Sequence, residues 1–275
     1  MRLSSGHFLL AVFFGVSLAQ AGEMEFESSG GTFFQYYLTQ DNRFNQSPVL
    51  PPGYRFAFSI DNLVYRNSIG HFFINAADAT VISRSDTSII KLDKIRYRIE
   101  PGFRAIGYRH ESNILLSHEC IHQIDRPRAG GSIFWNSIQA NYGTKGAYDY
   151  NMVERVVQRD FQLRNSWDYE VMGDAYLFGH SNAFIAQNQD YRGHAGVKLR
   201  YNWALWEKSA FYADLTEDEW VTAAGELQNR SMAQINWVLL SQKSVGILYG
   251  EYTFRDENPY DNENSLVSIG FRILY

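Results

Sequence analysis

Apolar and polar side chains alternate one by one along several stretches of this chain. In the clearest stretch, 191–203, Val197 and Leu199 alternate with Lys198 and Arg200. An α-helix cannot sort residues with a period of two, whereas a β-strand with one apolar face and one polar face does. The same pattern recurs in 54–64, 231–239 and 267–275. We therefore predict a fold of antiparallel β-strands.

Composition narrows the class of β fold. The 275 residues include 18 Tyr, 19 Phe and 6 Trp, which is more aromatic material than an ordinary soluble core requires. A mean hydropathy of −0.32 excludes a bundle of membrane helices. The strands have charged residues on the face opposite their apolar face. In a soluble sandwich or lipocalin-like barrel, the face that points to the core would instead be apolar. We predict an all-β fold, a transmembrane antiparallel β-barrel of about 10 to 12 strands with a polar interior.

Both ends of the chain suggest export to the bacterial outer membrane. Arg2, the apolar run 8–19 and the small residues of Ala19-Gln20-Ala21 predict a signal peptide over residues 1–21. The barrel domain would then occupy 22–275. The chain ends on Tyr275 within a predicted strand, and this ending resembles the C-terminal signal of outer-membrane barrels, so we expect the barrel assembly machinery as a partner.

Charge and cysteine content exclude other classes. The chain has 25 Lys+Arg against 30 Asp+Glu, so it presents no basic surface and we expect no nucleic-acid partner. A single Cys cannot form an internal disulfide or a thiolate zinc cluster. Packing and backbone hydrogen bonds must hold the fold together.

Polar residues interrupt the predicted lipid-facing surface. If 104–116 is read as one strand, His110 and Ser112 share an outward face with Ile114. Asn136 falls on the outward face of the next predicted strand, 132–142. Polar side chains facing lipid are costly, and such residues are functional candidates.

The expected connections place this polar group in the outer leaflet. We expect a short periplasmic turn at Glu100-Pro101-Gly102 and a long extracellular loop over 115–131. Chemically, the group resembles a nucleophile set. Ser112 would attack, His110 would take its proton, and Asn136 would orient the imidazole ring.

The same residues resemble a known family. His110-Glu111-Ser112-Asn113 followed by Trp135-Asn136 is similar to the pattern of outer-membrane phospholipase A, and the first part is shared by the lipid A 3-O-deacylases. The resemblance implies hydrolysis of ester-linked fatty acids from outer-leaflet phospholipid or lipid A, with calcium as cofactor and a homodimer as the active form. Ile114 and the long separation between Ser112 and Asn136 depart from the phospholipase pattern and leave calcium ligands unassigned.

Two alternatives remain open. The first is a non-enzymatic outer-membrane barrel, either a small channel or a structural protein. The second is a zinc metalloprotease, because His118-Glu119-Cys120-Ile121-His122 matches the H-E-x-x-H motif. On a helix, His118 and His122 would bind zinc and Glu119 would act as general base. In a barrel, the same segment would belong to an extracellular loop.

Overall fold

The computed structural model describes ten stretches of the chain: 27–40, 53–66, 70–83, 91–123, 132–148, 165–181, 191–203, 209–241, 244–257 and 265–274. The predicted signal peptide lies outside these residues. So do Tyr275 and the stretch 153–162, for which the sequence favours neither helix nor strand.

The described residues form twelve β-strands and one short 3₁₀ helix. The strands are β1 (Glu27–Gln40), β2 (Gly53–Arg66), β3 (Gly70–Ser83), β4 (Lys91–Ile106), β5 (His110–Gln123), β6 (Ser132–Thr144), β7 (Ser166–Ser181), β8 (Tyr191–Asn202), β9 (Ser209–Thr222), β10 (Leu227–Leu240), β11 (Val245–Asp256) and β12 (Leu266–Leu274). The 3₁₀ helix η2 (Lys145–Ala147) follows β6. Within the described part of the chain, no helix is long and apolar enough to cross a membrane.

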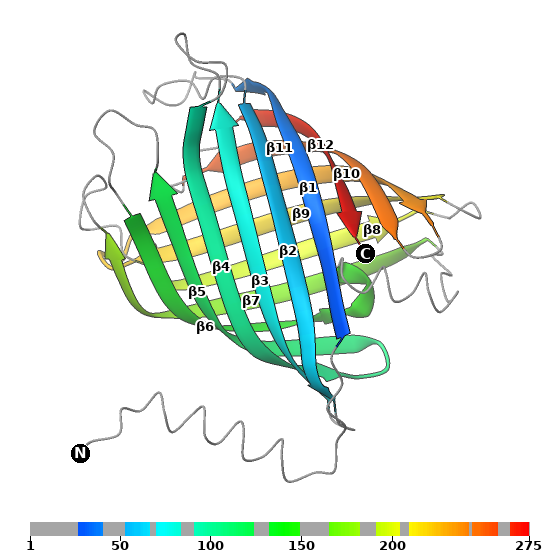
Figure 1. Ribbon diagram of the computed structural model, residues 1–275, viewed down its shortest axis with the longest axis horizontal. Helices are drawn as coiled ribbons and strands as arrows, with labels where there is room; N and C mark the ends of the chain where they lie inside the picture. Colours follow the sequence, from blue (N-terminus) through cyan, green and yellow to red (C-terminus); the bar gives the residue numbers. More distant parts are fainter. Residues whose placement is uncertain are drawn as a thin grey trace.

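The strands form one closed barrel in chain order. Each strand pairs antiparallel with its sequence neighbours, and β1 pairs with β12 to close the sheet (Figure 1). At this seam Gly31 lies opposite Leu274. Closure satisfies the backbone hydrogen bonds of both edge strands, which lipid could not do. The predicted all-β barrel is confirmed, with the larger of the expected strand numbers.

Alternation separates a lipid-facing surface from a polar interior. On β8, Val197 and Leu199 are exposed, whereas Arg200 is 1% exposed and points inward. On β12, Ile269, Phe271 and Ile273 are exposed in the same way. The outward belt is therefore apolar and aromatic, as the sequence pattern predicts.

One strand departs from simple alternation. The register of β8 shifts between Tyr191 and Gly193, where Tyr191 lies opposite Thr222 and Gly193 opposite Val221. This bulge turns Tyr191 into the interior, where it is buried. Gly193 stays on the outward face of the strand. The sequence prediction had placed both residues on one face.

The lengths of the connections distinguish the two ends of the barrel. One end carries the start of β1, the end of β12 and the brief links 67–69, 107–109, 203–208 and 241–244. The other end carries 41–52, 84–90, 124–131, 182–190, 223–226 and 257–265. Bacterial barrels have short periplasmic turns and longer extracellular loops, so the first end is periplasmic. The longest link at that end, 145–165, begins with η2.

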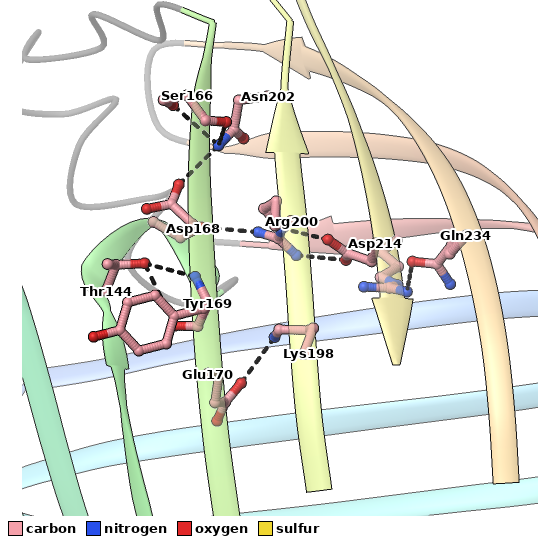
Figure 2. A network of polar contacts seen from close by, with 12 residues as sticks. Thr144, Ser166, Asp168, Tyr169, Glu170, Lys198, Arg200, Asn202, Asp214 and Gln234 are labelled. Atoms are coloured by element: carbon pink, nitrogen blue, oxygen red, sulfur yellow. Dashed lines mark hydrogen bonds and ion pairs between the residues drawn. The ribbon is translucent and has the colours of Figure 1, made fainter. Parts of the chain in front are cut away.

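Paired charges fill the interior near the periplasmic end. Figure 2 shows Arg200 of β8 reaching Asp214 of β9, with both guanidinium–carboxylate distances at 2.7 Å. Arg200 also donates to the backbone oxygen of Gly146 in η2 at 3.1 Å. Asn202 donates to Asp168 at 2.7 Å. These bonds attach η2 and the start of β7 to the barrel wall.

Similar pairing continues farther along the interior. Lys198 lies 2.9 Å from Glu170, and His194 contacts Asp174 at 2.7 Å and Asp218 at 3.1 Å. Lys198 and Arg200 therefore each face a carboxylate that compensates their charge within the lumen.

The residue after η2 is buried. Tyr148 is 5% exposed. Burial raises the pKa of its phenol, and the nearby carboxylates of Glu170 and Glu111 raise it further. The phenol of Tyr148 therefore stays protonated at neutral pH.

Candidate functional site

The structure corrects the strand on which His110 and Ser112 were placed. Residues 104–116 are not one strand: β4 ends at Ile106, 107–109 form a tight turn, and β5 begins at His110. The Gly107 backbone N–H donates to the His110 carbonyl at 2.9 Å across this turn. The expected turn at 100–102 lies within β4 instead. Ser112 does share the outward face with Ile114. However, Ser112 lies on β5 opposite Ala105 of β4, and not farther along the same strand as Ala105.

His110 and Ser112 consequently lie at the periplasmic end, not at outer-leaflet depth. His110 stacks on the Tyr142 ring with centroids 5.5 Å apart, and it lies 6.1 Å from the Tyr169 ring. Aromatic rings of this kind form the girdle at a membrane–water interface. The imidazole of His110 therefore has the surroundings of an aromatic side chain at the membrane–water interface.

The register also separates Asn136 from these two residues. Asn136 is outward, as predicted, but Ser112 lies opposite Tyr142 and His110 opposite Thr144. Asn136 is six positions from Tyr142 along β6, which corresponds to about 20 Å. The structure therefore does not bring Ser112, His110 and Asn136 together. The alternation pattern predicts which face each residue takes, but it carries no information on the pairing register.

The H-E-x-x-H segment lies on a strand, which corrects the zinc alternative. His118, Glu119 and His122 all belong to β5, so the segment is neither a helix nor a loop. The two histidines point outward about 13 Å apart along the strand, because four residues span that length in β geometry. Glu119 points inward and pairs with Arg96.

No zinc site can form from that arrangement, because its intended ligands and base are on opposite faces or too far apart. More generally, the described residues contain no group of three or more His, Cys, Asp or Glu side chains arranged to hold a metal ion.

A different polar cluster occupies the outward face of β5 and β6. Asn136 lies directly opposite His118 in the register. His118 Nδ1 and Asn136 Oδ1 are 2.9 Å apart. Two positions along β5, Cys120 Sγ lies 3.0 Å from Nε2 of His122. We call His118, Cys120, His122 and Asn136 the outward cluster.

The outward cluster lies at the extracellular end and is surrounded by apolar and aromatic side chains. His118 pairs with Ile99 of β4, and Cys120 lies between Tyr97 of β4 and Phe134 of β6. Ile99 and Tyr97 are 51% and 41% exposed on the lipid-facing surface. A thiol and two imidazoles therefore lie among lipid-facing side chains at this place.

The contact with Asn136 indicates the tautomer of the His118 imidazole. An amide oxygen only accepts hydrogen bonds, so Nδ1 of His118 carries the proton that it donates to Asn136. The lone pair of His118 is then on Nε2. In a thiol–imidazole pair such as Cys120 and His122, the imidazole can take the thiol proton and leave a thiolate nucleophile.

One signal in the sequence could have identified the cluster. His118-Glu119-Cys120 repeats the spacing of His110-Glu111-Ser112, with a thiol in place of the hydroxyl, and it is closer in sequence to Trp135-Asn136. Sequence reasoning assigned this segment to a loop, in which residues two apart need not share a face.

Comparison with known proteins identifies the fold. No protein-family model and no curated protein sequence matches the chain. Among solved structures, outer membrane phospholipase A from Escherichia coli aligns with a TM-score of 0.50 and 10% identity, over 94% of this chain and 95% of that one. The calcium-bound dimer of the Salmonella typhi phospholipase gives 0.49 and 9%, over 94% and 95%. The KdgM porin gives 0.46 and 5%, over 89% and 98%.

Identities of this size show the fold alone. The closed antiparallel barrel and its apolar outer belt define a β-barrel of the bacterial outer-membrane type. The outer-membrane location predicted from the sequence is thereby confirmed. Within this class, the fold resembles that of outer membrane phospholipase A.

Proposed function

We propose that this protein is an outer-membrane acyl hydrolase that cleaves ester-linked fatty acids from outer-leaflet lipid, with Cys120 as the nucleophile. The observation that carries the proposal is the 3.0 Å approach of the Cys120 thiol to the His122 imidazole on the lipid-facing surface. Polar side chains are costly at such a surface, and a thiol next to a base has a chemical use there.

The proposed reaction follows from this pair. The imidazole accepts the thiol proton, the sulfur attacks the ester carbonyl carbon, and the leaving alcohol takes the proton as the tetrahedral intermediate collapses. Water then hydrolyses the thioester and restores the thiol. Asn136 retains the orienting role that the family resemblance implied, but its partner is His118 instead of His110.

The substrate class follows from location. The cluster faces the acyl region of the outer leaflet near the extracellular end, so phospholipid and lipid A are both candidate esters. Calcium, which the family resemblance implied, stays an expectation, and none of the steps above depends on it.

A non-enzymatic barrel is the second candidate. The paired charges within the lumen, such as Arg200 with Asp214, favour a structural protein over an ion-selective channel. In that case the outward cluster would have no catalytic role.

A substitution pair on one strand tests the hydrolase. Purified protein in detergent is mixed with phospholipid or lipopolysaccharide, and released fatty acid is measured by mass spectrometry with calcium or with a chelator. We expect Cys120→Ala to lower release by about 10³-fold or more, because the nucleophile is lost. Ser112→Ala, on the same outward face of β5, is the matched control and should retain activity within about twofold.

Each outcome has a defined meaning. Cys120 is the single cysteine of the chain, so alkylation should inhibit the wild type and leave the residual rate of Cys120→Ala unchanged. Full activity in Cys120→Ala would overturn the thiol mechanism, and loss in Ser112→Ala would restore the serine hypothesis. No release from either lipid class by folded wild-type protein would leave the structural barrel as the function.

A further inference from the structure

Cys120 has an imidazole on either side of it along the same strand face. His118 and His122 are two positions before and after it, so each lies about 7 Å away in backbone terms. All three side chains point to lipid because residues i, i+2 and i+4 of a strand share a face. A single general base is sufficient for acyl transfer through a thiol, so a second imidazole at this site needs an explanation.

The two imidazoles have different surroundings. His122 contacts the thiol directly, and its ring packs edge-on against Tyr97 with centroids 5.8 Å apart. His118 instead donates its Nδ1–H to Asn136 at 2.9 Å. The second arrangement fixes the tautomer and the ring plane, and it leaves Nε2 as the basic atom.

We infer that the two histidines divide the reaction: His122 activates the Cys120 thiol for acylation, and His118, held by Asn136, is the general base for the acceptor that cleaves the acyl-thioester. The inference rests on the proposed function and assigns separate groups to its two halves. His118 is a catalytic residue in this scheme, and Asn136 is a positioning residue.

The proton balance of the two halves is complete. In acylation, the thiol proton passes to His122 and then to the leaving alcohol, as the carbon–sulfur bond forms and the ester carbon–oxygen bond breaks. In deacylation, the acceptor, water or a lipid hydroxyl, gives its proton to Nε2 of His118 as its oxygen bonds to the carbonyl carbon. The thiolate leaves, and protonated His118 returns the proton to it.

Accumulation of the acyl-enzyme tests this division. The full-length protein in detergent is mixed with a medium-chain p-nitrophenyl ester, and p-nitrophenol release is followed together with the intact protein mass. With one cysteine in the chain, a mass increase of one acyl group that is absent in Cys120→Ala reports thioester formation. We expect His122→Gln to form no thioester. We expect His118→Gln to show a full burst and then to turn over about 10²-fold or more slowly.

Hydroxylamine separates the two roles, because it attacks thioesters without a general base. It should restore turnover of His118→Gln and leave His122→Gln inactive. Asn136→Ala should resemble His118→Gln in a milder form, and Asn136→Asp should recover because a carboxylate also accepts from Nδ1. His110→Gln, on the same face at the periplasmic end, is the control and should behave as the wild type. Heat-modifiable migration on gels verifies that each variant is folded.

The failures are distinguishable. If wild-type protein never acquires an acyl group on Cys120, the proposed function fails. If it does, but His118→Gln and His122→Gln lose acylation alike, one base serves both steps and the division is wrong. If only His118→Gln loses acylation, the roles are reversed: His118 activates the thiol and His122 is the base for deacylation.

Discussion

Asn236 lies fully inside the barrel, and neither end of its amide group has a hydrogen-bond partner among the described residues. The register places it between Tyr212 and Tyr249 on the adjacent strands. An unsatisfied buried amide costs free energy, in contrast to Asn202, which is equally buried but donates to Asp168 at 2.7 Å.

We therefore expect Asn236→Leu to stabilise the barrel by about 1–3 kcal/mol, because the desolvation cost of the amide disappears at similar side-chain volume. Asn202→Leu is the control and should destabilise it, since Asp168 loses a donor. The measurement is the urea concentration at half-unfolding in detergent. A lower midpoint for Asn236→Leu would show that the amide has a partner beyond the described residues.

For a single residue, alternation predicts the face of the strand, whereas its cross-strand neighbour follows from the fold. Alternation correctly placed His110, Ser112 and Asn136 outward. It could not reveal that Asn136 faces His118, because cross-strand partners depend on where the chain turns. The tight turn at 107–109 set that register, and its sequence was read as continuous strand.

The short helix η2 lies close against strand β7. A Cβ on Gly146 would collide with the Asp168 carboxylate, and the Gly146 carbonyl accepts from Arg200. Glycine at this position permits close approach of η2 to β7.

Gly146→Ala should consequently lower the free energy of unfolding by about 1–3 kcal/mol, because either η2 or Asp168 must move. Gly250→Ala on β11 is a matched control, since a Cβ there meets no atom within 4 Å. Chemical denaturation of both variants decides the point. Equal stability would mean that η2 accommodates the methyl group without losing its contacts.

At this scale the strands with strong alternation were predictable. The stretches around 191–203 and 231–239 were recognised because apolar and polar faces differ sharply. The end of β5 was not, because His118, Cys120 and His122 make its outward face polar and imitate a loop or a helical zinc motif.

For the whole molecule, charge pairing decides whether the lumen conducts. Arg200 with Asp214 and Lys198 with Glu170 each pair one cation with one carboxylate, and His194 lies between the carboxylates of Asp174 and Asp218. Small barrels are commonly filled by their own side chains, and η2 is attached to the inner wall through the bond from Arg200 to Gly146.

We expect wild-type protein in planar bilayers to show no steady single-channel conductance. Arg200→Ala should increase transient openings, because it releases η2 from the wall and leaves Asp214 unpaired. Lys198→Met is the comparison, because it removes an inward charge at a position that lies away from η2. A constant ohmic conductance in the wild type would contradict the filled lumen and favour the channel alternative.

Dimer formation, which the family resemblance implied, stays a prediction. Cross-linking of the protein in the membrane would test it.

The alternation pattern specifies the class of molecule, because strands with a two-residue period and an aromatic outer face are stable in a bilayer as a closed barrel with satisfied backbone hydrogen bonds. The same pattern specifies which side chains meet lipid. Which of those side chains meet one another depends on the folded chain, since register is set by turns and closure and not by alternation. That register moved the candidate chemistry from Ser112 to Cys120 along the same face of one strand.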